Sequence, residues 1–376
     1  MTNKNEASMK ALAAELLAPA DVKIDGDRPW DIQVNNDKLF TRIFREGSLG
    51  FGESYMDGWW DCEALDELIH RILRNRVDKN MPFNWKVFIY RLSGLLFNRQ
   101  TQRRSWVVGK EHYDLGNDIF EATFDSRITG SCGYWKTATT LDAAQDAKLD
   151  LICRKIGLKP GQTVLDIGCG WGAFMKYAAE HYGATCVGAT VSKQQVKLGK
   201  DLCNRLPVEF RLMDYRDISG KYDHVVSMGM FEHVGYKNFD TYFNVARNAL
   251  KDDGLFLLHT IGANVSEQVI DPWLDKYIFP NGAIPSIDAI GKSLSGKFVV
   301  EDWHNFGTDY DKTLIAWMNK FNQHWPKLKE KYTESFYRMW RYYLLSCAGG
   351  FRSRNIQVWQ LVLSKDGQLS RYQSIR

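Results

Sequence analysis

Residues 164–174 read Val-Leu-Asp-Ile-Gly-Cys-Gly-Trp-Gly-Ala-Phe. An apolar, strand-like start runs into a turn that contains Gly168, Gly170 and Gly172, and the chain beyond it has helical spacing. Glycine has no Cβ, so it permits a tight turn, close packing of the helix on the strand, and close approach of the backbone to a ligand. The stretch therefore predicts a site for a nucleotide-like ligand at the end of a strand.

The spacing of the glycines narrows the class of ligand. The pattern Asp-x-Gly-x-Gly-x-Gly differs from the dinucleotide fingerprint Gly-x-Gly-x-x-Gly, and it lacks the Gly-Lys-Ser/Thr of a phosphate loop. It resembles motif I of class I S-adenosylmethionine (SAM) methyltransferases. A turn without a ligand is the alternative, which three glycines in five residues disfavour. The resemblance implies that the cofactor contacts Asp166, Gly168, Cys169, Gly170, Trp171 and Gly172.

Strand-like segments recur through the second half of the chain, and helical segments separate most of the early ones. This alternation predicts an α/β fold with a mostly parallel, seven-stranded sheet and helices on both faces. In such sheets the ligand lies beyond the carboxyl ends of the strands, so residues that follow strands are the first candidates for a site. The predicted strands are 163–167, 185–190, 208–213, 223–228, 254–261, 297–303 and 357–364.

Two groups of polar residues follow the second and third predicted strands. Thr190 and Gln195 come after the second strand, and Asp214, Tyr215 and Arg216 come after the third. We expect all five to line the cofactor. Because no acidic residue follows the second strand, the ribose contact is expected to come from Thr190 and Gln195.

A carboxylate and an imidazole belong to the fourth and fifth predicted strands. Glu232 follows the fourth strand, and His259 lies at the end of the fifth. Together they suit acid–base chemistry or the binding of an anion. Glu232 could instead be a carboxylate at a helix N-terminus, where the helix dipole stabilises it, and His259 could be a core histidine. Their shared strand-end position favours a functional role. No spacing such as His-Glu-x-x-His is present, so no metal is predicted.

Length, charge and cysteine content limit the classes of function. A chain of 376 residues is expected to form two domains. Its 49 Lys and Arg against 45 Asp and Glu give a net charge of +4, too small to imply nucleic-acid binding. The seven cysteines lack Cys-x-x-Cys spacing, which favours reduced thiols in a cytoplasmic protein. No signal peptide or membrane span is predicted, so membrane contact would be peripheral.

The first hundred residues have a different pattern from the rest. Helices are expected at 8–17, 65–73 and 85–97, a small hairpin or meander at 22–34, and a shaped loop with short helical turns at 45–61. The helix at 85–97 is amphipathic; such a helix more often packs on its own core than lies on a bilayer. The basic run 98–104 predicts a linker, and three of its charges could attract anionic lipid headgroups. The predicted domains are 1–97 and 108–376, joined by a linker at 98–107.

Further along, helices are expected at 141–156 and over 310–340.

Six segments spread along the chain carry a closer resemblance, to the bacterial cyclopropane-fatty-acyl-phospholipid synthase family. The likeness spans nearly the whole chain, including the small N-terminal domain. The segments are Gly-Ser-Leu-Gly-Phe-Gly-Glu-Ser-Tyr-Met-Asp-Gly-Trp-Trp (47–60), Gly-Lys-Glu-His-Tyr-Asp-Leu-Gly-Asn-Asp (109–118), Leu-Asp-Ile-Gly-Cys-Gly-Trp-Gly (165–172), Met-Phe-Glu-His-Val-Gly (230–235), Tyr-Ile-Phe-Pro-Asn-Gly (277–282) and Asp-Trp-His-Asn-Phe-Gly-x-Asp-Tyr (302–310).

This resemblance implies a reaction and a set of catalytic residues. The family transfers a methyl group from SAM to a cis double bond in a phospholipid acyl chain, and a bound bicarbonate then takes a proton so that the ring closes. Carried over by motif, the bicarbonate would be held by Cys132, Glu232, His259, Tyr310 and the backbone of Ile261. Cys347 matches a cysteine considered catalytic in the family, but this mechanism needs no thiol nucleophile, so a structural role is favoured.

One departure from the family pattern concerns the cofactor. The family usually has an aromatic residue before Ser-Cys, whereas this chain has Gly130-Ser131-Cys132. The aromatic contact with the cofactor is then absent, while Ser131 can keep a polar contact. The resemblance also implies a homodimer that works at the phospholipid bilayer surface, on the inner face of the cytoplasmic membrane.

Two other functions stay open at this point. A SAM methyltransferase could stop at a methyl-branched lipid or act on a small soluble acceptor. A lipid-binding or carrier protein could keep the methyltransferase fold without catalysis, which the aromatic content of 13% and the basic linker also suit.

Overall fold

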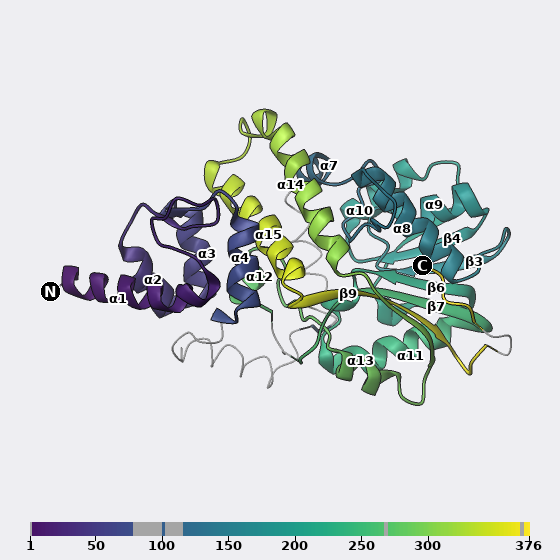
Figure 1. Ribbon diagram of the computed structural model, residues 1–376. Coiled ribbons are helices and arrows are strands. Elements are labelled where there is room, and N and C mark those ends of the chain that lie inside the picture. Colours follow the sequence, from purple (N-terminus) through teal and green to yellow (C-terminus); the bar gives the residue numbers. More distant parts are fainter. Residues whose placement is uncertain (1, 78–99, 102–115, 267–269, 369–371) are drawn as a thin grey trace. The chain divides into compact units, whose positions relative to one another are not determined.

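A computed structural model describes residues 2–77, 100–101, 116–266, 270–368 and 372–376 (Figure 1). The chain forms two compact units, and both are discontinuous in sequence. The first contains Met1–Phe97, Val269–Pro280 and Tyr310–Ile356; the second contains Asn98–Gln268, Asn281–Asp309 and Gln357–Arg376. The predicted helix at 85–97 and most of the predicted linker lie outside the described residues.

The second unit is built on a seven-stranded sheet with the strand order β5-β4-β3-β6-β7-β9-β8. Strands β5, β4, β3, β6 and β7 run parallel to one another, and β8 is antiparallel to β9. All seven predicted strands and the predicted α/β class are therefore confirmed. The strands are β3 (Thr163–Ile167), β4 (Thr185–Thr190), β5 (Val208–Leu212), β6 (Tyr222–Met228), β7 (Leu250–Ala263), β8 (Val299–Asn305) and β9 (Ile356–Ser364).

Helices cover both faces of this sheet, because successive strand residues point to opposite sides. Val164 and Val226 pack in a core with α8 (Leu141–Lys155) and α9 (Ala173–Tyr182). Their neighbours Leu165 and Val225 pack in a second core with α11 (Phe239–Ala249) and α13 (Ile287–Leu294). Figure 1 shows the two layers, with α10 (Lys193–Leu202) on the side of α8 and α9. Alternation therefore turns Asp166 towards α8 and α9.

The first unit combines the N-terminal helices with helices from the end of the chain. Helix α15 packs on α3 and α4 so closely that a Cβ on Gly349 would lie 2.5 Å from the backbone oxygen of Asp66. This packing explains why the predicted catalytic range 108–376 is not one compact unit. The elements are α1 (Thr2–Leu17), β1 (Gln33–Val34), α2 (Lys38–Glu46), α3 (Ser48–Met56), β2 (Trp60–Asp61), α4 (Leu65–Arg74), α12 (Pro272–Tyr277), α14 (Thr308–Leu328) and α15 (Glu334–Arg352).

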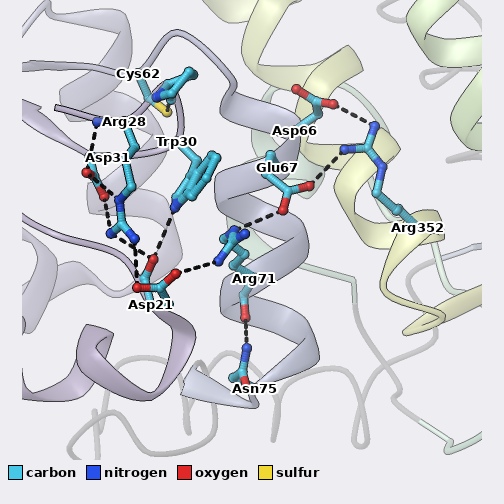
Figure 2. Close-up of polar contacts among 11 residues, drawn as sticks. Asp21, Arg28, Trp30, Asp31, Cys62, Asp66, Glu67, Arg71, Asn75 and Arg352 are labelled. Atoms are coloured by element: carbon cyan, nitrogen blue, oxygen red, sulfur yellow. Dashed lines mark hydrogen bonds and ion pairs between the residues drawn. The ribbon is translucent and has the colours of Figure 1, made fainter. Parts of the chain in front are cut away.

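Charged side chains link the N-terminal segment to α4 and α15 within this unit (Figure 2). Arg71 of α4 binds Asp21 at 3.2 Å and Glu67 at 2.9 Å. Arg352 of α15 binds Glu67 at 3.2 Å and Asp66 at 2.6 Å. The ion pairs add a polar connection to the apolar packing of α15 on α4.

The small hairpin or meander predicted at 22–34 is reduced to a single isolated bridge, between Ile24 and Ile32. Strand β1 has only two residues and pairs with β2, and the preceding loop is organised by the buried side chain of Asp31. Its carboxylate accepts hydrogen bonds from the backbone nitrogens of Lys23 at 2.8 Å and Arg28 at 3.1 Å. A carboxylate therefore satisfies the backbone donors that a hairpin partner strand would have satisfied.

The shaped loop predicted at 45–61 is also replaced by regular structure. Helix α2 ends at Glu46, and Gly47, with φ = 62°, separates it from α3, which follows directly. Two glycines inside α3 serve close packing. A Cβ on Gly50 would lie 2.7 Å from the Arg42 backbone oxygen, and one on Gly52 would lie 2.5 Å from the Trp273 ring.

Across the described ranges, the helices are all too short or too polar to span a membrane.

Candidate functional site

The glycine turn follows β3 and is tethered to the neighbouring strand. The backbone nitrogens of Gly168 and Cys169 donate to the Ala189 oxygen at 3.0 and 3.1 Å. Gly168, Gly170 and Gly172 all have positive φ, at 83°, 53° and 87°. Left-handed backbone of this kind favours glycine, so the turn has the predicted conformation.

The three glycines meet different surroundings. A Cβ on Gly168 would lie 2.5 Å from Met230 Cγ, and one on Gly172 would lie 2.5 Å from the Phe210 ring. A Cβ on Gly170 would have no heavy atom of the described chain within 4 Å. Two of the glycines therefore allow close packing, while Gly170 leaves open space at the predicted cofactor site.

Asp166 stands directly before this turn as a buried carboxylate. It is 1% exposed, and neither of its oxygens has a hydrogen-bond partner among the described residues. Burial raises its pKa to about 7, although the positive charge of Lys148 acts in the opposite direction. An unpaired buried carboxylate is costly, so the site fits a ligand that brings a hydrogen-bond donor or a positive charge.

The raised pKa of Asp166 predicts a dependence of stability on pH. A folded-state pKa above the unfolded value of 3.8 means that this group's contribution is present at low pH and lost as the pH rises towards 7. From pH 5 to pH 8 the unfolding free energy of the ligand-free protein should fall by about 2–3 kcal/mol relative to Asp166→Asn. Chemical unfolding of both proteins measures this difference. A difference that does not change with pH would contradict the prediction.

The residues after β4 and β5 bond mainly to one another. Thr190 Oγ1 donates to Gln195 Oε1 at 2.6 Å, and both side chains are buried. Asp214 accepts from the backbone and the guanidinium of Arg216, each at 3.0 Å. The Tyr215 hydroxyl is buried without a partner in the described parts of the chain. Gln195 lies in the first turn of α10, and the other four stand at the predicted strand ends. Contact of these five residues with a cofactor stays a prediction.

Glu232 is in direct contact with the backbone of Ile261. Glu232 lies in the short 3₁₀ turn Phe231–His233, and its Oε1 accepts from the Ile261 nitrogen at 2.6 Å. The other oxygen, Oε2, is buried and has no partner among the residues that the structure describes. Burial raises the pKa of Glu232 to about 7. At neutral pH its carboxyl group can therefore accept or donate a proton at Oε2.

His259 lies on β7, two residues before Ile261. It is not at the strand end, because β7 continues to Ala263. The ring is buried, lies edge-on to Phe306 at 5.7 Å, and has Nδ1 3.3 Å from Gln360 Nε2. Burial lowers the pKa of His259 well below its usual value, so the imidazole is neutral at pH 7.

Ser131 and Cys132 are both buried, and sequence reasoning missed the residues that hold them. Ser131 Oγ accepts from Lys148 Nζ at 2.8 Å, and the Ser131 backbone oxygen accepts from Gln145 Nε2 at 2.8 Å. Lys148 and Gln145 lie on α8 and have no exposed surface. The sequence gives little signal for them, because α8 also contains five other charged residues and one of these, Lys155, is buried as well.

An aromatic ring lies beside Gly130, the position at which the family usually has an aromatic residue. A Cβ on Gly130 would lie 3.3 Å from the ring of Phe124. That ring packs on Phe120 with centroids 5.5 Å apart, and Phe120 packs on Trp171 of the glycine turn at 5.2 Å. Phe124 therefore brings an aromatic ring beside Gly130.

Tyr310 and Cys347 belong to the first unit. The Tyr310 ring is buried against Phe351 and Trp317, with centroids 4.5 and 5.9 Å away. Cys347 lies on α15, and burial raises its pKa to about 12. A thiol with that pKa is a poor nucleophile at neutral pH, which agrees with the structural role favoured for it. The predicted contact of Tyr310 with an anion stays a prediction.

Within the described ranges, no group of three or more His, Cys, Asp or Glu side chains is arranged to hold a metal ion.

Comparisons with known proteins relate both the sequence and the fold to one group of enzymes. Residues 100–361 match the family model for mycolic acid cyclopropane synthetase. Cyclopropane-fatty-acyl-phospholipid synthase of Escherichia coli K12 is 51% identical over 354 residues, which cover 94% of this chain and 93% of that protein. A tuberculostearic acid methyltransferase of Mycobacterium tuberculosis is 34% identical over 88% of this chain and 82% of its own length.

A solved structure extends the comparison to the fold. A mycolic acid cyclopropane synthase in complex with SAH and CTAB has 33% identity and a TM-score of 0.64. The match covers 69% of this chain and 98% of that one.

Proposed function

The chain belongs to the mycolic acid cyclopropane synthetase family and has the class I SAM methyltransferase fold, and from this premise we propose that it forms cyclopropane rings on unsaturated acyl chains of membrane phospholipids. It is an enzyme of the SAM-dependent methyltransferase class, with SAM as the methyl donor. The observation that carries the proposal is Oε2 of Glu232, which is buried and has no hydrogen-bond partner among the described residues. Its side chain is held by a hydrogen bond from the Ile261 nitrogen.

The chemistry explains why such a site is needed. An alkene is a poor nucleophile, so the methyl donor must be an activated sulfonium. A C–C bond forms as the C–S bond breaks, and a carbocation is left on the acyl chain. Loss of a proton from the transferred methyl group then allows the second C–C bond to close the ring. Water must be excluded until that proton has left, because water would trap the cation.

The residues present fit an anionic base. Bicarbonate would supply the group that accepts the methyl proton. A carboxylate beside an anion is repulsive, but Glu232 has a pKa of about 7, so its neutral form is populated at neutral pH and can donate a hydrogen bond. The neutral imidazole of His259, the Ile261 backbone, Cys132 and Tyr310 are the other proposed contacts. Each contact would hold the base or orient its proton.

The product distinguishes this function from its alternatives. SAM and vesicles of unsaturated phospholipid should yield lipid with cyclopropane ring protons in the ¹H NMR spectrum. A methyl-branched product, the second candidate suggested by the likeness to the tuberculostearic acid methyltransferase, would lack those signals. Protein that binds SAM and transfers no labelled methyl group to lipid would overturn both lipid reactions and leave a small soluble acceptor or a carrier function.

Removal of bicarbonate provides a separate prediction. In carefully degassed buffer the rate of ring formation should fall, and added bicarbonate should restore it. Tyr310→Phe should raise the bicarbonate concentration needed for half-maximal rate about fivefold or more, because the variant loses a proposed hydrogen bond worth about 1 kcal/mol or more to the anion. Turnover as a function of bicarbonate concentration measures the effect. Equal rates with and without bicarbonate would point to a side chain as the base.

We also propose that the enzyme works as a homodimer at the inner surface of the cytoplasmic membrane. The family resemblance in segment 47–60 and the basic charges of the predicted linker at 98–107 support this placement. Sedimentation with anionic vesicles and measurement of the molecular mass in solution test the two parts separately.

A further inference from the structure

One turn of α8 holds the segment that carries Ser131 and Cys132. Gln145 donates to the Ser131 backbone oxygen at 2.8 Å, and Lys148 donates to Ser131 Oγ at 2.8 Å. The Tyr134 nitrogen donates to the Ala144 oxygen, also at 2.8 Å. Three hydrogen bonds thus fix four consecutive residues, with the fully buried Cys132 between the attachment points.

The close approach of the two segments depends on glycine. A Cβ on Gly133 would lie 3.0 Å from Ala144 Cβ and 3.3 Å from the Ala144 carbonyl carbon. A larger residue at 133 would push the segment away from α8 and lengthen the hydrogen bonds to Ser131. The position of Ser131 is therefore set by α8 through both packing and hydrogen bonds.

Burying a lysine to make such a contact is energetically unfavourable. Lys148 has no exposed surface, and burial lowers its pKa to about 8. The acidic side chains of Asp125 and Asp166 oppose that shift, so both lie close enough to stabilise the charge. Replacing a buried charge by an apolar side chain of similar size is often neutral or stabilising, so packing alone does not explain a lysine here.

Lys148 also relates the Ser131 segment to the glycine turn. Its ammonium group is bonded to Ser131 on one side and interacts with the unpaired carboxylate of Asp166 on the other. Both neighbours are predicted to contact the cofactor. A single side chain from α8 thus acts on the two segments that would enclose SAM.

We propose that Lys148 and Gln145 are positioning residues for SAM binding, which hold Ser131 and Cys132 at the fixed distance from the glycine turn that the cofactor requires. This inference rests on the proposed cofactor contact of Ser131. Neither residue needs to touch SAM, because each acts through Ser131.

Lys148→Met tests the inference, with Lys155→Met as the matched control. Lys155 lies two turns further along α8 and is equally buried, but it contacts His304 at 3.1 Å and Asp302 at 3.4 Å instead of Ser131. The dissociation constant of SAH, measured by calorimetry on the full chain, should rise about 10- to 100-fold in Lys148→Met. Both variants should lose thermal stability, while Lys155→Met should keep SAH affinity within about twofold.

A double-mutant cycle separates action through Ser131 from a general effect. Ser131→Ala should weaken SAH binding, and the double variant with Lys148→Met should bind no more weakly than Lys148→Met alone. Gln145→Met, which removes a neutral donor, should raise the dissociation constant about three- to tenfold and serves if Lys148→Met does not fold. Equal losses in Lys148→Met and Lys155→Met, or multiplying effects of Lys148→Met and Ser131→Ala, would overturn the inference.

The assay uses SAH and no lipid, so its outcome is independent of the acceptor. Wild-type protein that binds SAH but makes no cyclopropane lipid would refute the proposed function and leave this inference standing.

Discussion

Glu232→Gln is expected to lower the rate of ring formation by about 10³-fold while SAH binding stays within about threefold of the wild type. The amide can still accept the hydrogen bond from the Ile261 nitrogen that Glu232 Oε1 accepts at 2.6 Å, so the local fold should persist. What it loses is the proton that a carboxyl group with a pKa of about 7 can exchange at the Oε2 position. Initial rates of methyl transfer to phospholipid vesicles measure the effect.

Glu209→Gln is the matched control for this change. Glu209 lies on β5 of the same unit, and its exposed carboxylate pairs with Arg211 at 2.7 Å. The same loss of charge there should leave the rate within about twofold, because exposed ion pairs contribute little. If Glu232→Gln kept more than about a tenth of the wild-type rate, Glu232 could not be holding the base.

Gly168→Ala is expected to lower the unfolding free energy by about 3 kcal/mol and to abolish SAM binding. An alanine at 168 would have both an unfavourable φ of 83° and a methyl group 2.5 Å from Met230 Cγ. Met230 directly precedes the turn that carries Glu232, so relief of the clash would move that turn as well. Chemical unfolding and calorimetric titration with SAH measure the two effects.

Gly170→Ala separates the conformational requirement from the steric one. Its φ of 53° is also left-handed, but the added methyl group would meet no described heavy atom within 4 Å. The stability cost should be about 1 kcal/mol, while the methyl group would enter the space expected to hold the cofactor and weaken SAH binding about tenfold. If the two variants lost stability equally, the contact with Met230 would not distinguish them.

The sheet was predictable because its strands are short apolar runs with turn residues at their ends. The structure extends β7 back to Leu250, across Lys251, Asp252 and Asp253. These three residues are exposed, so they carry no apolar pattern that a sequence could reveal. Helix α3 was missed for the opposite reason. Gly50 and Gly52 resemble helix breakers, but the contacts that require them come from Arg42 and Trp273.

The candidate site was predictable where chain position alone determines geometry. Glu232 and Ile261 come together because they follow the last paired residues, Met228 and His259, of the parallel strands β6 and β7. The role of Lys148 could not be predicted, since a lysine in a helix ordinarily faces solvent. The bond between Thr190 and Gln195 was also missed, because it depends on side-chain orientation after a tight turn.

The chemistry of the cysteines makes this enzyme convenient for site-specific labelling. All seven cysteines lie in the described ranges and none is in a disulfide, and six have pKa values raised by burial, with Cys203 at about 11 and Cys62 at about 12. Thiol-reactive dyes attack thiolates, so the native side chains should react slowly at neutral pH. A single Val265→Cys, at a position that is 57% exposed, could then carry a fluorophore or spin label without a cysteine-free background.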